Sequence, residues 1–503
     1  KEAVEIAKLR LFLKLVATVD ADYKKPNLGL EPLPDIDFNI RSGNTLIGYA
    51  TKKEIDSLQG MFVTQKMKEQ ILEECELVSR AFQRFKEIQL GGYENKKEFT
   101  KAKTELNNRL GKLAGNLNKI LYKQHYESMD YEKWLETHQP FHWFAEFYEI
   151  IQDKGGFNIV IGNPPYLEFR QIDYHPKGLK TIDSGAVHNM CIERSLQILN
   201  SKGNISMIVP LALVCTQRMT IVQNLLEANR TTWYSNFAWR PGKLFENVNR
   251  ALTIFVSNNS ESHNVYSTNY IKWSSDTRDD VFPNISFTPW NEKRDAFWIP
   301  KLGNWKEERI LKKVLKSGNN ISYLISKNTT NRVYYRTTGG LYWKIFTNFS
   351  PKFFVNGKEG KSSRETYFTV LEKNQDIVCI SLLSSNLFWW WYTVTSNLRD
   401  LNPIDIQGFK FPSIVLNNPE LIELGRRYLK DLENNSTMLT RIQKQTGETQ
   451  TQSFKISISK PIIDEIDTVL AQHYGFTEEE LDFIINYDIK YRMGKELENG
   501  EEE

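Results

Sequence analysis

The fold of this chain is decided by one stretch of ten residues, Phe157-Asn158-Ile159-Val160-Ile161-Gly162-Asn163-Pro164-Pro165-Tyr166. Its first half is apolar and rich in β-branched residues, which predicts a buried strand. The two prolines that follow lock their φ angles and predict a rigid turn. A side-chain amide, a fixed carbonyl and an aromatic ring are therefore expected together at the end of a strand.

Strand and helix patterns alternate after this turn. Helices are predicted at 191–199 and 217–229, and strands at 203–209 and 250–257. Alternation of this kind predicts an α/β fold, with a mostly parallel sheet and helices packed on it. Functional side chains in such sheets lie at the carboxyl ends of the strands. Asn163 is expected at one of these ends.

The turn has a chemistry of its own. The side-chain oxygen of Asn163 and the carbonyl of Pro164 can together accept both hydrogens of an exocyclic amino group. The ring of Tyr166 can stack on the base that carries this group. No covalent nucleophile is needed for such a site, because positioning and polar stabilisation supply the catalysis.

The motif Asn163-Pro164-Pro165-Tyr166 resembles motif IV of amino-methyltransferases, above all the DNA adenine-N6 enzymes. The likeness extends to the large type IIG restriction–modification enzymes and related phage-defence methyltransferases. Residues 1–11 look like their helix after motif II, and 39–48 look like their motif III turn. Residues 140–147 look like the lead-in to motif IV, and 203–210 look like their motif VI strand.

The resemblance implies a reaction and roles for named residues. A methyl group would pass from S-adenosylmethionine to N6 of an adenine flipped out of the duplex. Asn163, Pro164, Pro165 and Tyr166 would form the catalytic set, and Tyr166 would stack on one face of the base. The segment 243–250 is similar to motif VIII, so Phe245 would close the other face. An ordinary loop-anchoring role is the alternative for Phe245.

Asn44, in the motif III turn, is the candidate contact with the cofactor, and a plain tight turn is the alternative. Motifs I and II of the family would precede residue 1, so the S-adenosylmethionine site is expected to be incomplete here. The chain has no initiating methionine and opens inside a helical pattern. We therefore expect the carboxyl-side part of a longer enzyme, inactive by itself. Mg²⁺ would be needed only if a nuclease domain lies upstream.

Five regions are predicted, and they make an incomplete Rossmann-like methyltransferase sheet with additions. The first part of the core covers 1–51, a helical-hairpin insertion covers 52–137, and the core with the motif covers 138–260. An α+β target-recognition domain is predicted at 261–412 and a helical C-terminal region at 413–503. The insertion has two expected arms, 54–90 and 97–126, and serves either as a DNA-flanking arm or as a solvated structural addition.

Residues 301–360 are the candidate DNA-binding surface. They contain 12 Lys and Arg against 3 Glu and no Asp, together with many aromatic residues. Cations neutralise phosphates, and Arg or Lys can also read guanine edges. The candidates for contact with double-stranded DNA are Arg332, Tyr335, Arg336 and Lys344. A basic surface without a nucleic-acid role is the alternative.

The composition narrows the class of protein. The chain has 503 residues, of which 40% are hydrophobic and 25% charged, as in an ordinary globular protein. Its four cysteines have no paired spacing, which favours a reducing cytoplasm over a disulfide framework. No apolar run reaches the roughly 20 residues of a membrane span, and no metal-ligand spacing is found. The pattern gives no oligomeric state.

Two other functions fit parts of the pattern. The same turn could serve a methyltransferase that acts on a protein glutamine or on RNA, because it accepts any planar amide or amine. The chain could also be a non-catalytic DNA-specificity module that keeps only part of a methyltransferase fold. The long basic and aromatic region favours the DNA adenine-N6 methyltransferase over the first of these.

Overall fold

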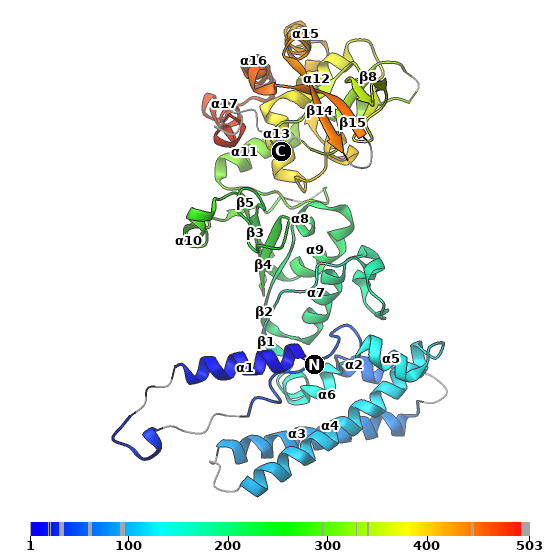
Figure 1. Ribbon diagram of the computed structural model, residues 1–503, viewed down its shortest axis with the longest axis vertical. Helices are drawn as coiled ribbons and strands as arrows, with labels where there is room; N and C mark the ends of the chain where they lie inside the picture. Colours follow the sequence, from blue (N-terminus) through cyan, green and yellow to red (C-terminus); the bar gives the residue numbers. More distant parts are fainter. Residues whose placement is uncertain are drawn as a thin grey trace. The chain divides into compact units, whose positions relative to one another are not determined.

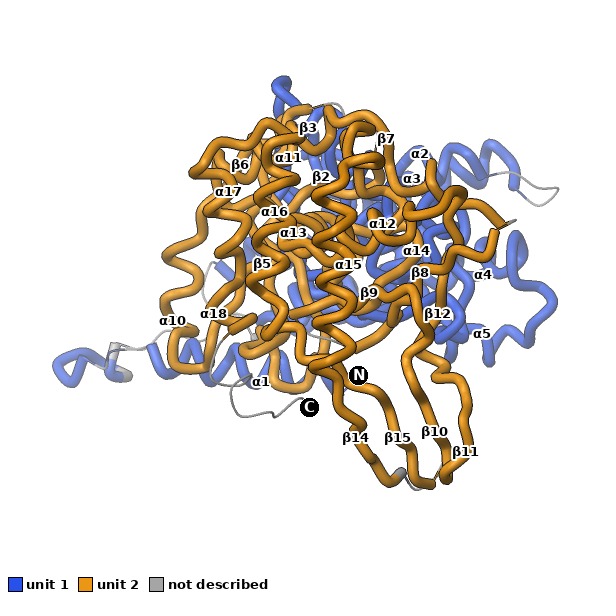
Figure 2. Tube along the Cα trace, turned by 90° about the horizontal axis from the view of Figure 1, so that it is seen from above, with its two compact units in different colours: residues 1–209, 218–232, 254–263 blue, residues 210–217, 233–253, 264–503 orange. Residues whose placement is uncertain are grey.

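The computed structural model describes residues 2–18, 20, 22–29, 35–58, 63–90, 96–292, 296–327, 329–339, 342–443 and 447–493. Its elements are shown in Figure 1. The chain divides into two compact units, which Figure 2 shows in different colours. Unit 1 comprises 1–209, 218–232 and 254–263, and unit 2 comprises 210–217, 233–253 and 264–503.

A six-stranded sheet has the strand order β1-β2-β4-β3-β5-β6. Its strands are β1 (Phe157–Gly162), β2 (Leu199–Pro210), β3 (Arg230–Phe237), β4 (Leu252–Asn259), β5 (Val265–Ile271) and β6 (Thr288–Pro289). The predicted α/β organisation is present. β1 and β2 run parallel as predicted, whereas β5 and β6 are antiparallel, so the sheet is mixed. The sheet also continues beyond residue 260, where the sequence pattern placed the end of the core.

A long helical hairpin dominates the first part of unit 1. Helix α3 (Gln65–Leu90) packs along α4 (Lys96–His125), as Figure 1 shows. Buried residues of α3 recur at helical spacing, at 71, 75, 78 and 85, and face an apolar stripe of α4. The two predicted arms are thus present, and the expected link Gly91-Gly92-Tyr93 lies outside the described residues.

Other helices flank this hairpin in the chain. Helices α1 (Glu2–Val16) and α2 (Lys52–Asp56) precede it, and α5 (Tyr131–His138) and α6 (Trp143–Glu146) lie between it and β1. The side chain of Thr51 accepts a hydrogen bond from the N–H of Glu54 at the start of α2. The carboxylate of Glu54 in turn accepts from the N–H of Thr51, which completes a capping box. Arg194 also donates to Glu54, so α2 is tied to the helix that precedes β2.

Helix α7 (Val187–Ile198) leads into β2, and almost all of its residues are buried. It packs against α9 (Thr220–Glu227), whose apolar residues lie on one face. The remaining short helix of this region is α8 (Ala212–Cys215) in unit 2. The two longer helices confirm the predictions at 191–199 and 217–229, within a few residues at each end.

Unit 2 is built around two apolar helices, α12 (Gln375–Ser384) and α13 (Asn386–Thr395). Trp389, Trp390 and Trp391 are buried there, so these rings serve core packing. The helices that surround them are α11 (Trp305–Lys316), α14 (Pro403–Gln407), α15 (Pro419–Asn434), α16 (Lys460–Tyr474), α17 (Glu478–Ile485) and α18 (Ile489–Arg492); α10 (Arg278–Val281) is a separate short turn.

Three smaller sheets complete unit 2. A three-stranded sheet has the order β12-β8-β9, with β8 (Arg332–Arg336), β9 (Phe346–Thr347) and β12 (Glu365–Thr369). A two-stranded sheet joins β7 (Asn319–Asn320) to β13 (Lys410–Phe411). The third has four strands in the order β11-β10-β15-β14, with β10 (Phe353–Val355), β11 (Lys358–Glu359), β14 (Ser436–Gln443) and β15 (Gly447–Phe454).

The third sheet corrects the prediction that 413–503 is helical. The polar segment from 434 to 453, expected to be a linker, forms β14 and β15 instead. Its threonines are β-branched, and each strand residue pairs with a partner across the hairpin. Low hydrophobicity concealed the strands, because an exposed sheet has no buried face to produce an alternating pattern.

None of the described helices is, by itself, long and apolar enough to cross a membrane. Helices α12 and α13 would meet that test only as a pair bent by 65°.

Candidate functional site

The predicted turn lies at the carboxyl end of β1. Gly162, the last residue of this strand, is opposite Met207 of the parallel strand β2. Parallel neighbours end at the same edge of a sheet, so the turn after Gly162 and the end of β2 share one edge. The structure thus places Asn163 where the alternating pattern predicts functional side chains.

The residues of the turn differ in their exposure to solvent. Asn163 and Pro165 are exposed, Pro164 is buried and Tyr166 is half-buried. The Tyr166 hydroxyl lies 2.7 Å from Oδ1 of Asn163 and 3.2 Å from the carbonyl oxygen of Ile208 on β2. Tyr166 therefore links the turn to the neighbouring strand.

This hydrogen bond sets the orientation of the Asn163 amide. In this structure the amide oxygen of Asn163 faces Tyr166 and accepts from its hydroxyl at 2.7 Å. An amide oxygen has two lone pairs, and Tyr166 uses one of them. The second can accept a hydrogen from an incoming amino group. The turn thus holds an oriented acceptor at an open edge of the sheet.

The chain after Tyr166 is anchored at several points. The backbone N–H of Val187 donates to the carbonyl of Leu167 at 2.9 Å, and that of Phe169 donates to Gly185 at 2.7 Å. Glu168 forms a bidentate pair with Arg218, with N–O distances of 2.6 and 2.7 Å. These contacts hold the segment behind the turn against the start of α7.

Sequence reasoning missed Glu168 and Arg218. They are 50 residues apart, and no motif links them. Arg218 also donates to the carbonyl of Ser184 at 3.0 Å. The hydrogen bond from Arg218 lowers the pKa of Glu168, and the same bond raises the pKa of Arg218. The pair is about 40% exposed, so it is a positioning contact rather than a buried charge pair.

The motif III turn is packed against the lead-in to motif IV. The N–H of Asn44 donates to the carbonyl of Gln139 at 2.7 Å, and that of Phe141 donates to Ile47 at 2.7 Å. Gly48 has a φ of +137°, and a Cβ there would lie 2.1 Å from the carbonyl oxygen of Phe141. Only glycine fits this close approach.

Asn44 itself is half-buried, and its side-chain oxygen accepts from the N–H of Leu46 at 3.1 Å. This contact is the Asx turn expected of asparagine in a tight turn. The structure accounts for Asn44 by local turn formation, the alternative already open from the sequence, and the oxygen is engaged within the turn.

Phe245 belongs to unit 2, where it lies on an irregular loop and is 36% exposed. Arg278 holds this loop by donating to the carbonyls of Lys243 and Leu244, at 3.0 and 2.9 Å. The ring of Phe245 therefore lies on a loop whose backbone is held by the hydrogen bonds from Arg278.

The four DNA-binding candidates separate into two kinds. Along β8, side chains alternate between the core and the outer face. Tyr335 is only 5% exposed and packs against the rings of Phe346 and Phe368. Its ring is therefore part of the core and not available to DNA. This correction follows from its parity in the strand, which the unpatterned sequence around it did not reveal.

Lys344 is also turned inward. Its ammonium lies 4.8 Å from the ring centroid of Tyr392, and burial lowers its pKa to about 8. Its ammonium also donates to the carbonyl of Gly339 at 3.4 Å, so this side chain is engaged by its own surroundings. Gly340 and Leu341 of the predicted 334–344 surface lie outside the described residues.

Arg332 and Arg336 occupy the outer face of β8, beside two tyrosines that the sequence reasoning did not single out. Tyr334 on β8 is paired with Tyr367 on β12, and their ring centroids are 5.4 Å apart. The guanidinium of Arg332 lies 4.7 Å from the Tyr367 ring centroid and donates to the Tyr334 hydroxyl. The alternation of side chains along β8, together with its pairing to β12, is the signal that identifies these residues as one exposed face.

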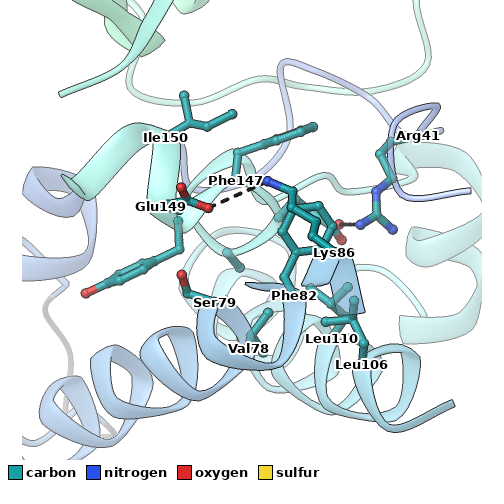
Figure 3. Close-up of a pocket in the computed structure, with 13 residues that line it drawn as sticks. Arg41, Val78, Ser79, Phe82, Lys86, Leu106, Leu110, Phe147, Glu149 and Ile150 are labelled. Carbon is teal, nitrogen blue, oxygen red and sulfur yellow. Dashed lines mark ion pairs between the residues drawn. The ribbon is translucent and has the colours of Figure 1, made fainter. Parts of the chain in front are cut away.

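Unit 1 also contains a small cavity between the hairpin and the region of α6, drawn in Figure 3. Its volume is about 40 Å³. Lys86 reaches toward Glu149 across it, with an ion-pair distance of 3.8 Å. A cavity of this size holds water-sized molecules and is far smaller than the pockets that bind cofactors. Its lining includes no residue of the 163–166 turn.

No group of three or more His, Cys, Asp and Glu side chains is arranged for a metal ion within the part of the chain that the structure describes.

Comparison with known proteins gives one family and one curated relative. Residues 1–240 match the family described as Eco57I restriction-modification methylase. A putative type II restriction enzyme and methyltransferase of Methanocaldococcus jannaschii is 28% identical over 215 residues. That alignment covers 33% of this chain, and the chain spans only 17% of the length of this relative.

Solved structures with partial likeness include two restriction–modification enzymes. One is the Type IIL enzyme MmeI in complex with DNA, with 11% identity, a TM-score of 0.37, and coverage of 65% of this chain and 56% of that chain. The other is a nuclease-deletion mutant of the Type ISP enzyme LlaGI in complex with a DNA substrate mimic, with 11% identity, a TM-score of 0.33, and coverage of 66% and 48%.

Proposed function

We propose that this chain is part of a site-specific DNA methyltransferase of the restriction–modification group, of type IIG-like organisation, that methylates N6 of adenine. The observation that carries the proposal is the oriented amide of Asn163 at the carboxyl end of β1. The match of residues 1–240 to a restriction-modification methylase family supports it. The chain spans only 17% of the length of its curated relative, so the activity of the whole protein is itself part of this proposal.

The turn would act on the amino group of the base. That nitrogen is a poor nucleophile while its lone pair is delocalised into the ring. Hydrogen bonds from its two N–H groups to Asn163 Oδ1 and the Pro164 carbonyl would draw it toward sp3 geometry and localise the lone pair. Pro164 and Pro165 keep the carbonyl in place because their φ angles are locked. This is electrostatic preorganisation, with the acceptors fixed before the base arrives.

The base would have to leave the duplex to reach this edge. Tyr166 offers a ring beside Asn163, and we propose that it stacks on the flipped base. Phe245 is the proposed ring for the opposite face. The anchoring of the following segment by Glu168 and Arg218 would keep Tyr166 in position during this step.

S-adenosylmethionine would supply the electrophilic methyl group when bound. We propose that this chain by itself does not hold the whole of that donor site. Within the described residues, the side-chain oxygen of Asn44 is engaged by the N–H of Leu46, and β1 lies at an edge of the six-stranded sheet. β1 was predicted to be a buried strand, but Ile159 and Ile161 on it are 67% and 80% exposed. We propose that further elements of the whole protein pack on this apolar face and carry the donor site.

We propose that double-stranded DNA contacts the outer face of β8 and β12. Arg332 and Arg336 can neutralise phosphates there, and Tyr334 and Tyr367 add planar surface.

An incomplete donor site would also fit the second candidate, a non-catalytic DNA-specificity module. The two functions differ in one measurement, the binding of labelled S-adenosylmethionine by the full-length protein. A methyltransferase binds the label and a pure specificity module does not.

The chemistry is tested by product analysis. Full-length protein would be incubated with labelled S-adenosylmethionine and a mixed duplex library, and the DNA would be digested to nucleosides. We expect the label in N6-methyladenine. Label in N4-methylcytosine would overturn the base assignment, and label only in RNA or protein would overturn DNA as the substrate.

A further inference from the structure

The four-stranded sheet of unit 2 projects from the helices around it, as Figure 2 shows for β14, β15, β10 and β11. We refer to these four strands as the β-arm. We propose that one face of the β-arm is a docking surface for duplex DNA and binds phosphates on both sides of a groove. The inference rests on the proposed DNA partner and adds β14 and β15, which lie outside the predicted recognition domain 261–412, to the DNA-binding surface.

Local sequence explains why the β-arm forms. Val355 pairs with Lys358, and the two residues between them are Asn356 and Gly357, with φ angles of +49° and +78°. Two positive φ angles in an Asn-Gly hairpin make the type I′ turn, whose twist matches that of the strands. The side-chain oxygen of Asn356 also accepts from the N–H of Glu448 at 2.9 Å. The two hairpins are thereby locked together near their ends.

Strand pairing assigns every side chain of the β-arm to one of two faces. One continuous cross-strand row contains Arg441, Thr449, Val355 and Lys358, each paired with the next. The neighbouring row on this face contains Leu439, Thr451 and Phe353. Directly paired residues share a face, and successive residues alternate. We call this face, defined by these two rows, the cationic face.

The opposite face has a different charge. Its rows contain Met438, Gln452 and Lys352; Thr440, Gln450, Phe354 and Glu359; and Ile442 with Glu448. The cationic face therefore has two cations and no acid among these residues, whereas the opposite face has one cation and two acids. A polyanion is attracted to the first face and not to the second.

The spacing of the two cations fits a duplex. Arg441 and Lys358 stand at the two ends of one row and are three strand spacings apart, about 14 Å. The major groove of B-DNA is about 12 Å wide. The two side chains can therefore meet phosphates on opposite edges of the groove. Both side chains are exposed, and neither has an ion pair within the described residues.

The residues between the cations suit the space above a groove. Leu439 is 40% exposed, Thr451, Val355 and Phe353 are half-buried, and Thr449 is buried with its hydroxyl donating to the carbonyl of Arg441. These side chains carry no charge, so they place no like charge beside the phosphates. A flat row of hydroxyl and apolar groups flanked by cations is the complement of a groove flanked by phosphates.

Another occupant of the β-arm would be a second copy of the chain. Strand β14 is at the edge of the sheet, and exposed edge strands can pair with other chains. We favour DNA because of the charge difference between the faces, and the test distinguishes the two.

The test is the salt dependence of DNA binding by the full-length protein. Each phosphate contact contributes about 0.9 to the slope of log K against log salt concentration. We expect Arg441→Ala and Lys358→Ala each to reduce the slope by about 0.9, with their folding unchanged. Lys352→Ala removes the same charge from the opposite face and is the matched control, so its slope should equal that of the unmodified protein.

Equal slopes for all three variants would overturn the proposal, as would an equal loss in Lys352→Ala. A change of oligomeric state in place of DNA affinity would assign the β-arm to self-association. Failure here is distinguishable from failure of the proposed chemistry, because methylation at saturating protein concentration and low salt depends on the 163–166 turn and not on the β-arm. Absence of any DNA binding by the unmodified protein would contradict the β-arm proposal directly.

Discussion

The hydroxyl of Tyr166 donates a hydrogen bond of 2.7 Å to Oδ1 of Asn163. The bond joins the first and last residues of the turn and directs the amide oxygen of Asn163 toward Tyr166. It also gives Tyr166 two separable parts, a ring that can stack and a hydroxyl that orients a neighbour.

Replacement of Tyr166 by phenylalanine separates these parts. The ring remains and the orienting bond is lost, which is worth about 1 kcal/mol for a typical hydrogen bond. We expect kcat of the full-length protein to fall roughly fivefold, with little change in KM for DNA. Tyr166→Ala removes the ring as well, so KM should rise too. Identical kinetics for the two variants would show that the hydroxyl, and not the ring, accounts for the whole effect.

The Glu168–Arg218 pair predicts a dependence on pH. Arg218 lowers the pKa of Glu168, so the stabilisation is fully present above the unfolded pKa of about 4.3 and is lost as the pH falls through the lower folded pKa. Because the pair is partly exposed, we expect only about 0.5 kcal/mol. Urea unfolding from about pH 6 down to about pH 3 should show a steeper loss for the unmodified protein than for Glu168→Gln. Parallel curves would argue against the pair.

Gly48 and Gly111 should respond oppositely to alanine. At Gly48 a Cβ would clash with the carbonyl of Phe141, and φ is positive, so Gly48→Ala should lower the free energy of unfolding by about 2 kcal/mol. At Gly111, within α4, nothing lies within 4 Å of the new Cβ. Gly111→Ala should therefore raise it by up to about 1 kcal/mol. Denaturant titration measures both, and equal effects would contradict the packing described.

The outer and inner residues of β8 should also differ. Arg332→Ala should weaken DNA binding and reduce its salt slope by about 0.9, with the unfolding free energy unchanged. Tyr335→Ala should leave a cavity in the core of unit 2 and lower the free energy of unfolding by about 3 kcal/mol. Calorimetry and a binding titration on the same preparations test both. A stable Tyr335→Ala protein with weakened DNA binding would restore the ring as a contact.

Local patterns predicted much of the fold. The helices at 191–199 and 217–229 and the strands at 203–209 and 250–257 were found, because their apolar residues recur with the period of the element. Strand β3 was missed, since most of its residues are polar or aromatic and both faces are buried. The β-arm was missed for the opposite reason, because both of its faces are largely exposed.

The candidate site shows the same division. The sequence of the 163–166 turn gave its residues and its place at a strand end, because the prolines and the preceding strand are local. The sequence could not give the pairing of Glu168 with Arg218, which depends on how the segment just before α9 meets the chain after the turn. It also could not distinguish Tyr334 from Tyr335, because one step along a strand reverses the face and no buried alternation was visible.

The most direct measurement of the central claim compares Asn163→Ala with Asn158→Ala in the full-length protein. Asn158 is an exposed asparagine on the same strand, bonded only to the side chain of Asn200 in the described structure, so it controls for the loss of an amide. Both variants should bind duplex DNA and unfold as the unmodified protein does. We predict that Asn163→Ala loses adenine methylation by at least about 100-fold, while Asn158→Ala retains it. Undiminished methylation by Asn163→Ala would contradict the role assigned to the turn.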